Sequence, residues 1–171
     1  AGDLTDNLDW ELFSSIFPPA GVGADAEKIP VYICLGNHDG AAKGATRNGV
    51  LERNRVHAES KRFSAVSTNG LHYALNWDGV HILVLNLCPA DTVDEQTPFK
   101  YGKPGPGSWN DPDGAFTFMT TYLREKVGTS GEPVILVHHY GFDGFSMNDW
   151  YWWTPKQRKA LYDAFRPYNI L

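Results

Sequence analysis

Apolar and polar residues alternate along this chain with two periods, one typical of helices and the other of strands. Residues 7–17 carry an apolar side chain at every third or fourth position and precede Pro18, which predicts a short amphipathic helix. The inward face of this helix would consist of Leu8, Leu12, Phe13 and Ile16. Residues 29–35 are apolar and turn-forming residues 36–40 follow them, which predicts a short buried strand.

Residues 71–87 predict a β-hairpin. The first arm has an apolar residue at every second position, and Asp78-Gly79 is a typical two-residue hairpin turn. Residues 80–87 are almost wholly apolar. A strand that is apolar on both faces is usually covered from two sides, so we expect the second arm to be a central strand.

Two helices and two more strands are predicted in the second half of the chain. Residues 113–127 fit a helix that Asp113 caps and Gly128 ends, and residues 133–137 fit a buried strand. A capping box at residues 154–157 opens a helix that ends before Pro167, and residues 169–171 begin another strand. The inward helix faces would carry Phe116, Met119, Thr120, Leu123 and Val127, then Ala160, Leu161, Ala164 and Phe165.

Length and composition fit one globular domain. The 171 residues are 42% hydrophobic and 20% charged, enough for one core. We expect residues 1–171 to form a single α/β domain, with a long loop or insertion at 90–112 and an aromatic-rich loop at 140–153. The net charge of −5 argues against binding along a nucleic-acid backbone, and no apolar run is long enough for a membrane span. Cys34 and Cys88 lie in apolar runs, which predicts two free, buried thiols and leaves the compartment open.

The strongest chemical signal comes directly after the strand at 29–35. Asn37 offers an amide oxygen to a cation, His38 offers a titratable imidazole, and Asp39 can fix the tautomer of that imidazole. The alternative is a polar turn in which Asn37 and Asp39 hydrogen-bond only to the backbone.

Two other segments carry candidate metal ligands. Asp3 stands before the first predicted helix, where it can bridge cations, although aspartate is also the ordinary cap at that position. His138 and His139 follow the strand at 133–137, and successive residues of a strand point to opposite sides, so at least one should face the polar rim. The set Asp3, Asn37 and His138 mixes oxygen and nitrogen donors, which suits Zn, Mn or Fe better than Ca.

These segments, in this order, resemble the calcineurin-like metallophosphoesterase superfamily. Its motif blocks run Asp-x-His, Gly-Asp-x-x-Asp, Gly-Asn-His-Asp/Glu, His and Gly-His-x-His, and residues 2–6, 36–39 and 138 match the middle three. The resemblance implies a two-sheet sandwich flanked by helices and two divalent or trivalent metal ions. It further implies that Asp3 bridges both metals and that Asn37 and His138 bind the second. His38 would contact the phosphate and support the leaving group, and His139 would lie near the substrate.

The first and last blocks of the superfamily pattern are missing from this sequence. Asp3 should also stand at the end of a strand, yet only two residues precede it. We therefore expect a domain truncated at both ends, which retains the second metal site better than the first. Such a piece would be weak or inactive alone.

The activity implied by the resemblance is hydrolysis of a phosphate mono- or diester by metal-activated hydroxide. The expected substrate is a phosphorylated small molecule, sugar, nucleotide or lipid headgroup. The aromatic residues of 140–153, Trp152 among them, would form a wall for it or a small core that pins the next helix. An excess of basic residues at 41–62 would steer phosphate or lie on a solvated surface. The alternative functions are a non-catalytic module for carbohydrate or lipid headgroups on the same fold, and another dinuclear metallohydrolase.

Overall fold

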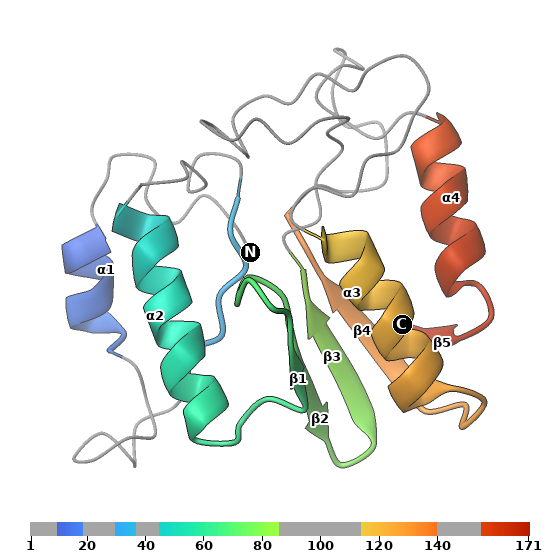
Figure 1. Cartoon of the computed structure of the whole chain (residues 1–171), viewed down its shortest axis with the longest axis horizontal. Coiled ribbons are helices and arrows are strands. Elements are labelled where there is room, and N and C mark those ends of the chain that lie inside the picture. Colours follow the sequence, from blue (N-terminus) through green and yellow to red (C-terminus); the bar gives the residue numbers. More distant parts are fainter. Residues whose placement is uncertain (1–9, 19–29, 37–44, 86–113, 140–154) are drawn as a thin grey trace.

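A computed structural model describes residues 10–18, 30–36, 45–85, 114–139 and 155–171 (Figure 1). These residues form an α/β fold, which confirms the expected fold class. One mixed sheet contains five strands in the order β1-β2-β3-β4-β5, with β1, β2 and β3 antiparallel and β3, β4 and β5 parallel. The strands are β1 (Ala65–Val66), β2 (Tyr73–Trp77), β3 (Val80–Val84), β4 (Pro133–Val137) and β5 (Asn169–Ile170).

Helices lie on both sides of this sheet. They are α1 (Trp10–Ile16), α2 (Ala45–Glu59), α3 (Ala115–Tyr122), which continues into a π-helical turn at Leu123–Val127, and α4 (Pro155–Phe165). Figure 1 shows α3 and α4 on one side of the sheet and α1 and α2 on the other. Within the described ranges, no helix is long and apolar enough to cross a membrane.

The predicted hairpin is confirmed as β2 and β3. Asp78 and Gly79 both adopt positive φ, at 51° and 82°, as the two central residues of a type I′ turn must. The backbone N–H of Gly79 donates to the side-chain oxygen of Asn76 at 3.2 Å. β3 is the third of the five strands, so the expectation of a central strand is also confirmed.

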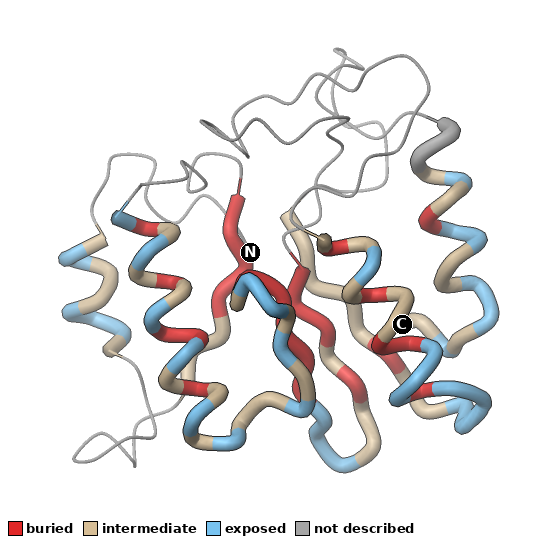
Figure 2. Tube along the Cα trace, viewed as in Figure 1, coloured by how far each residue is buried: buried red, intermediate tan, exposed pale blue. Residues whose placement is uncertain are grey.

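The α3 and α4 side of the sheet holds the largest core cluster. Parallel pairing of β3 with β4 and of β4 with β5 requires crossover connections, and α3 and α4 lie in these connections. Their apolar residues cover one face of the sheet, and Figure 2 shows buried positions on the strands and on the helix faces that look toward them. The fully buried members include Leu83, Met119, Leu123, Val134 and Leu161.

On the other side, the extended segment 30–36 lies between the sheet and the helices α1 and α2. Tyr32 and Cys34 pack toward β2 and β3, whereas Val31, Ile33 and Leu35 pack toward α1 and α2. This alternation has the period of two expected of a strand. The prediction of a strand at 29–35 is wrong for its described part, because residues 30–36 are extended but belong to no strand of the sheet. In the described ranges there is one sheet, and this segment forms the layer next to it.

Helix α1 exists as predicted but presents a different face. Leu12 and Ile16, expected inside, are 53% and 59% exposed, while Trp10 and Phe13 pack toward α2. The reason is Gly49 of α2, because an added Cβ there would lie only 1.9 Å from Cε2 of the Trp10 indole. The indole therefore rests directly on the backbone of α2, and this contact fixes the rotation of α1. Leu8 lies outside the described residues.

The inward faces of α3 and α4 are close to those expected. Met119, Leu123 and Val127 are buried as predicted, and Leu161 is fully buried. Phe116 and Thr120 are only half-buried. Ala115 and Tyr122, which were not predicted to face inward, are buried instead. The helix ends in a widened π-helical turn, in which the N–H of Gly128 donates to the carbonyl of Leu123 at 2.8 Å. This turn changes the direction in which the last side chains of the helix point. The expected cap, Asp113, lies outside the described residues.

Candidate active site

The carboxyl ends of β3 and β4 meet at one edge of the sheet. Sheet register places Tyr73 opposite Val84 and Val84 opposite Val137. One residue further, the N–H of Leu85 donates to the carbonyl of Val137 at 2.9 Å, so Leu85 and His138 stand side by side where the two strands end. In α/β folds ligands bind at this rim, outside the carboxyl ends of the strands.

The segment 30–36 reaches the same edge. The thiol of Cys34 donates to the carbonyl of Leu85 at 3.2 Å, and Cys34 belongs to one buried cluster with Tyr73 and Val84. Gly36, two residues further on, is buried and directly precedes the predicted Asn37 ligand. Figure 1 shows the segment running to the same end of the fold as β3 and β4. The backbone that leads into Asn37 therefore arrives beside the end of β3.

A tyrosine clamp holds this segment against the sheet. The hydroxyl of Tyr73, which is fully buried on β2, donates to the carbonyl of Ile33 at 2.8 Å. Burial raises the pKa of Tyr73 well above its usual 10, and the neighbouring Cys34 acts in the same direction. The phenol therefore stays a neutral donor at ordinary pH. Neither this clamp nor the Cys34 contact was expected from the sequence, because tyrosine and cysteine in apolar runs carry no signal of a specific partner.

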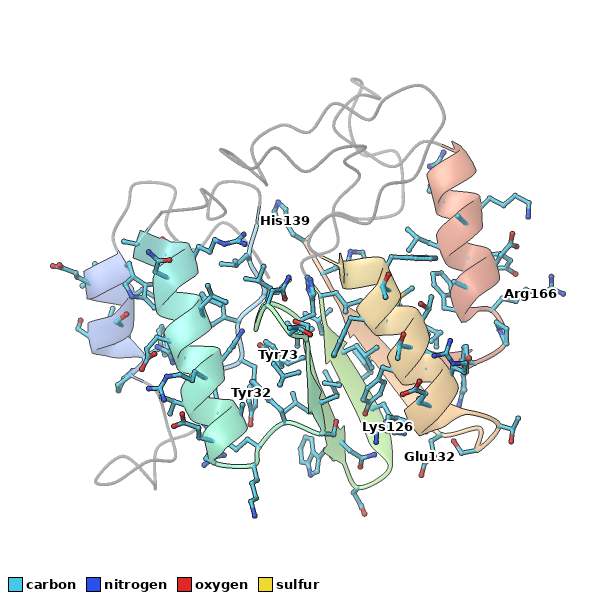
Figure 3. The ribbon with its side chains drawn as sticks, in the orientation of Figure 1. Tyr32, Tyr73, Lys126, Glu132, His139 and Arg166 are labelled. Carbon is cyan, nitrogen blue, oxygen red and sulfur yellow. The ribbon has the colours of Figure 1, made fainter. Side chains whose placement is uncertain are left out.

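Of the predicted site residues, the structure describes His138 and His139. Both are half-buried and follow β4 directly, and the Nδ1 atom of His138 is shielded from solvent. Figure 3 shows His139 at the end of β4 and Glu132 at the opposite end of that strand. The other predicted site residues, which are Asp3, Asn37, His38, Asp39 and Trp152, lie outside the described ranges.

The geometry of the described residues does not test the predicted metal centre. Among the described residues, no group of three or more His, Cys, Asp or Glu side chains is placed to hold a metal ion. Two of the three predicted ligands, Asp3 and Asn37, fall outside those residues. His138 stands at the rim next to the end of the segment that precedes Asn37, and its role as a metal ligand stays a prediction.

A second histidine site lies near the opposite edge of the sheet. The ring of His81 on β3 contacts Glu132 through Nε2 at 2.8 Å and the hydroxyl of Tyr122 through Nδ1 at 2.9 Å. Tyr122 also contacts the hydroxyl of Ser64 at 3.0 Å, and burial raises the pKa of Tyr122. Both nitrogens of His81 therefore have protein partners, which is typical of a structural histidine.

Two of the basic residues of 41–62, both in the described range 45–62, have other partners. Arg53 is buried, with its guanidinium 5.9 Å and 5.7 Å from the rings of Trp10 and Phe13. Arg55 is exposed and pairs with Glu52 at 2.5 Å and with Glu59. The Arg53 side chain is thus packed inside the protein, and the charge of Arg55 is balanced by neighbouring carboxylates.

Cys34 is a free, buried thiol as predicted, and Cys88 lies outside the described residues. The loops expected at 90–112 and 140–153 are likewise outside them.

Comparison with known proteins tests the family to which the fold and the motifs point. Searches of curated proteins and of solved structures found no match to this chain. A family model described as calcineurin-like phosphoesterase matches residues 1–167, which include all three motif segments and every element around the rim. The order of the motifs, the α/β fold and the position of His138 agree with this match, and the chain belongs to the calcineurin-like phosphoesterase family.

Proposed function

We propose that this chain hydrolyses a phosphate monoester or diester at the rim where β3 and β4 end. Membership in a family of metal-dependent phosphoesterases supports the reaction type. The observation that carries the proposal is the convergence of two distant segments. His138 follows β4, and the segment that leads into Asn37 is tied to Leu85 beside it by the Cys34 thiol.

The proposed metal ligands are Asp3, Asn37 and His138, with Mn, Fe or Zn as the ions. When bound, two such ions lower the pKa of an attacking water and neutralise charge on the phosphate. His38 donates a proton to the leaving oxygen, and Asp39 holds the imidazole in the tautomer that can do so. His139 and Trp152 contact the substrate. None of these side chains is assigned as a nucleophile.

The test combines activity with metal content. The chain is assayed with a chromogenic phosphate monoester and diester in the presence of Mn, Zn or Fe, and again after chelation. We expect metal-dependent hydrolysis of at least one ester, with only weak turnover when residues 1–171 are assayed alone and higher turnover in a longer parent protein. Replacing His138 with alanine should lower both bound metal, measured by plasma mass spectrometry, and turnover. Replacing His38 with alanine should lower turnover about 10²- to 10⁴-fold while bound metal stays unchanged.

Matched controls make the assignments testable. Asp3→Asn should also lower bound metal and turnover. Asp163 of α4 pairs with Lys159 at 2.5 Å on the exposed surface, so Asp163→Asn is its control and should leave both unchanged. For bound metal alone, His139→Ala is the control for His138→Ala, because it removes the adjacent imidazole, which is not a proposed metal ligand. Retained metal without hydrolysis of either ester would favour a binding module, and hydrolysis of amides alone would favour another metallohydrolase. Either result would contradict the proposal.

A further inference from the structure

A groove of about 560 Å³ lies between the β1–β2 turn and helix α3. This volume is within the range of roughly 300–1,000 Å³ that is common for small-molecule sites. Among the described residues that line it none is charged, and most of their side chains carry hydroxyl or amide groups. The lining residues with polar or aromatic side chains are Ser67, Thr68, Asn69, Thr117, Phe118 and Thr121.

The turn at one side of the groove is held rigid by its own hydrogen bonds. The hydroxyl of Ser67 donates to the side-chain oxygen of Asn69 at 2.7 Å, and the same oxygen accepts the N–H of Leu71 at 3.1 Å. The N–H of Ser67 donates to the carbonyl of His72 at 2.8 Å. A turn fixed in this way presents its remaining polar groups in one arrangement, which favours binding because little ordering is needed.

Two threonine hydroxyls on the groove are available to a ligand. Within the described ranges, neither Thr121 of α3 nor Thr68 of the turn uses its hydroxyl in a hydrogen bond. Thr120, the neighbour of Thr121, behaves differently, because its hydroxyl donates to the carbonyl of Phe116 at 2.9 Å and it does not line the groove. Phe118 supplies an apolar ring beside these hydroxyls, packed against Tyr122 at a centroid distance of 6.3 Å.

The groove opens at the same edge of the sheet as the proposed catalytic rim. The sheet register places four residues in one row across this edge: Ser67, His72, Leu85 and His138. Ser67 bonds to His72, the pairing of Tyr73 with Val84 puts His72 beside Leu85, and the bond from Leu85 to Val137 puts Leu85 beside His138. Three strand spacings of about 4.8 Å place Ser67 roughly 14 Å from His138. A ligand that spans this distance is longer than a simple small ester.

We propose that this groove is a subsite for the neutral, hydroxylated body of the substrate, a sugar or related polyol of about disaccharide length. The proposal rests on the proposed function, because the phosphate of such a substrate would lie at the rim. Threonine hydroxyls can both donate to and accept from sugar hydroxyls, and an aromatic ring packs on the apolar face of a sugar. The lack of charge in the groove suits this neutral part of the ligand rather than its phosphate.

The decisive experiment measures binding without catalysis. Maltose is titrated into the chain without added metal, and threonine methyl signals are followed by NMR. We expect the signals of Thr68, Thr117 and Thr121 to shift. The double variant Thr68→Val/Thr121→Val should bind maltose about tenfold more weakly, as expected for the loss of two hydrogen bonds. Thr120→Val is the matched control, and it should bind maltose like the wild type.

Catalysis supplies an independent readout. For a maltosyl phosphate, the double variant should raise KM about tenfold with little change in kcat, and p-nitrophenyl phosphate should be hydrolysed at the wild-type rate. Absence of maltose binding, shifts confined to other residues, or equal weakening by Thr120→Val would overturn the subsite. If the chain bound maltose in the groove but hydrolysed neither ester, the subsite would stand and the proposed hydrolysis would fall.

Discussion

The two faces of the central sheet are covered in different ways. On the α3 and α4 face, aliphatic side chains such as Leu83, Met119 and Leu161 are fully buried in one continuous cluster. On the opposite face, Ile82 and Tyr32 are only half-buried. A cavity of about 660 Å³ opens there between the segment 30–36 and the sheet. The first face therefore holds one large buried cluster, whereas the second holds two smaller buried clusters beside this cavity.

The second face also contains polar groups in costly positions. Arg53 and His57 of α2 are almost completely buried. Among the described residues, Nε and Nη1 of Arg53 have no hydrogen-bond partner, and the His57 ring has at most a weak contact with the backbone of Val31. Burying such groups opposes folding. The comparison predicts that the α3 and α4 face contributes more to stability than the other face, which positions the segment that leads into the candidate site.

The largest effect that tests this comparison comes from two neighbours on β3. Leu83 points into the fully buried cluster and Ile82 points to the other face. Leu83→Ala should lower the free energy of unfolding by about 3 kcal/mol, because it leaves a cavity in a dense core. Ile82→Ala should cost about 1 kcal/mol, since that side chain is already partly exposed. Urea unfolding of both variants measures the difference, and equal losses would contradict the comparison.

A smaller effect is expected where α1 rests on α2. Gly49→Ala places a methyl group into the indole of Trp10 and should cost about 2 kcal/mol, the usual range for overpacking. In a Trp10→Ala background the clash is absent, and the same change should stabilise by about 0.5–1 kcal/mol, because alanine favours helix over glycine. This reversal of sign in thermal or urea unfolding is the test. A loss in both backgrounds would show that the indole is not the obstacle.

The contrast between the faces also explains what the sequence could predict. The hairpin was found because Asp78-Gly79 and the alternation around it are local signals. Helix α2 was not assigned, because its buried residues are largely polar, as Thr46, Arg53, Asn54 and His57 show, and hydrophobic periodicity cannot detect such a face. The face of α1 was wrong because it depends on the space above Gly49, which is a tertiary contact.

The candidate site was predictable to a similar degree. The position of His138 after a buried strand followed from local pattern, and the structure places it at the rim. The contact of Cys34 with Leu85 holds the segment before Asn37 at that rim, and these two residues are 51 positions apart in the sequence. No local rule anticipates that contact, since a cysteine in an apolar run is equally suited to any core. The roles assigned to Asp3, Asn37, His38 and Asp39 stay predictions.

The smallest expected effect concerns His57 and pH. Burial lowers the pKa of His57 below 6.5, and the charges of Arg53 and Arg62 act in the same direction. As the pH falls through 6.5, the unfolded chain binds a proton at this residue and the folded chain does not, so stability decreases. His57→Leu should remove this part of the pH dependence, which amounts to less than about 1 kcal/mol between pH 8 and pH 6.

Measurement at pH 8 is the internal control for this variant. His57 is neutral there in both the folded and the unfolded chain. His57→Leu should then be neutral or slightly stabilising, because it removes buried, poorly partnered ring nitrogens and keeps the contact with Tyr32 and Phe63 apolar. A companion variant, Arg53→Met, removes the nearest charge and should weaken the pH dependence without abolishing it, since burial is the larger cause. An unchanged slope of unfolding free energy against pH in His57→Leu would mean that the second face tolerates its buried histidine without cost. The difference between the faces would then lie in packing density alone.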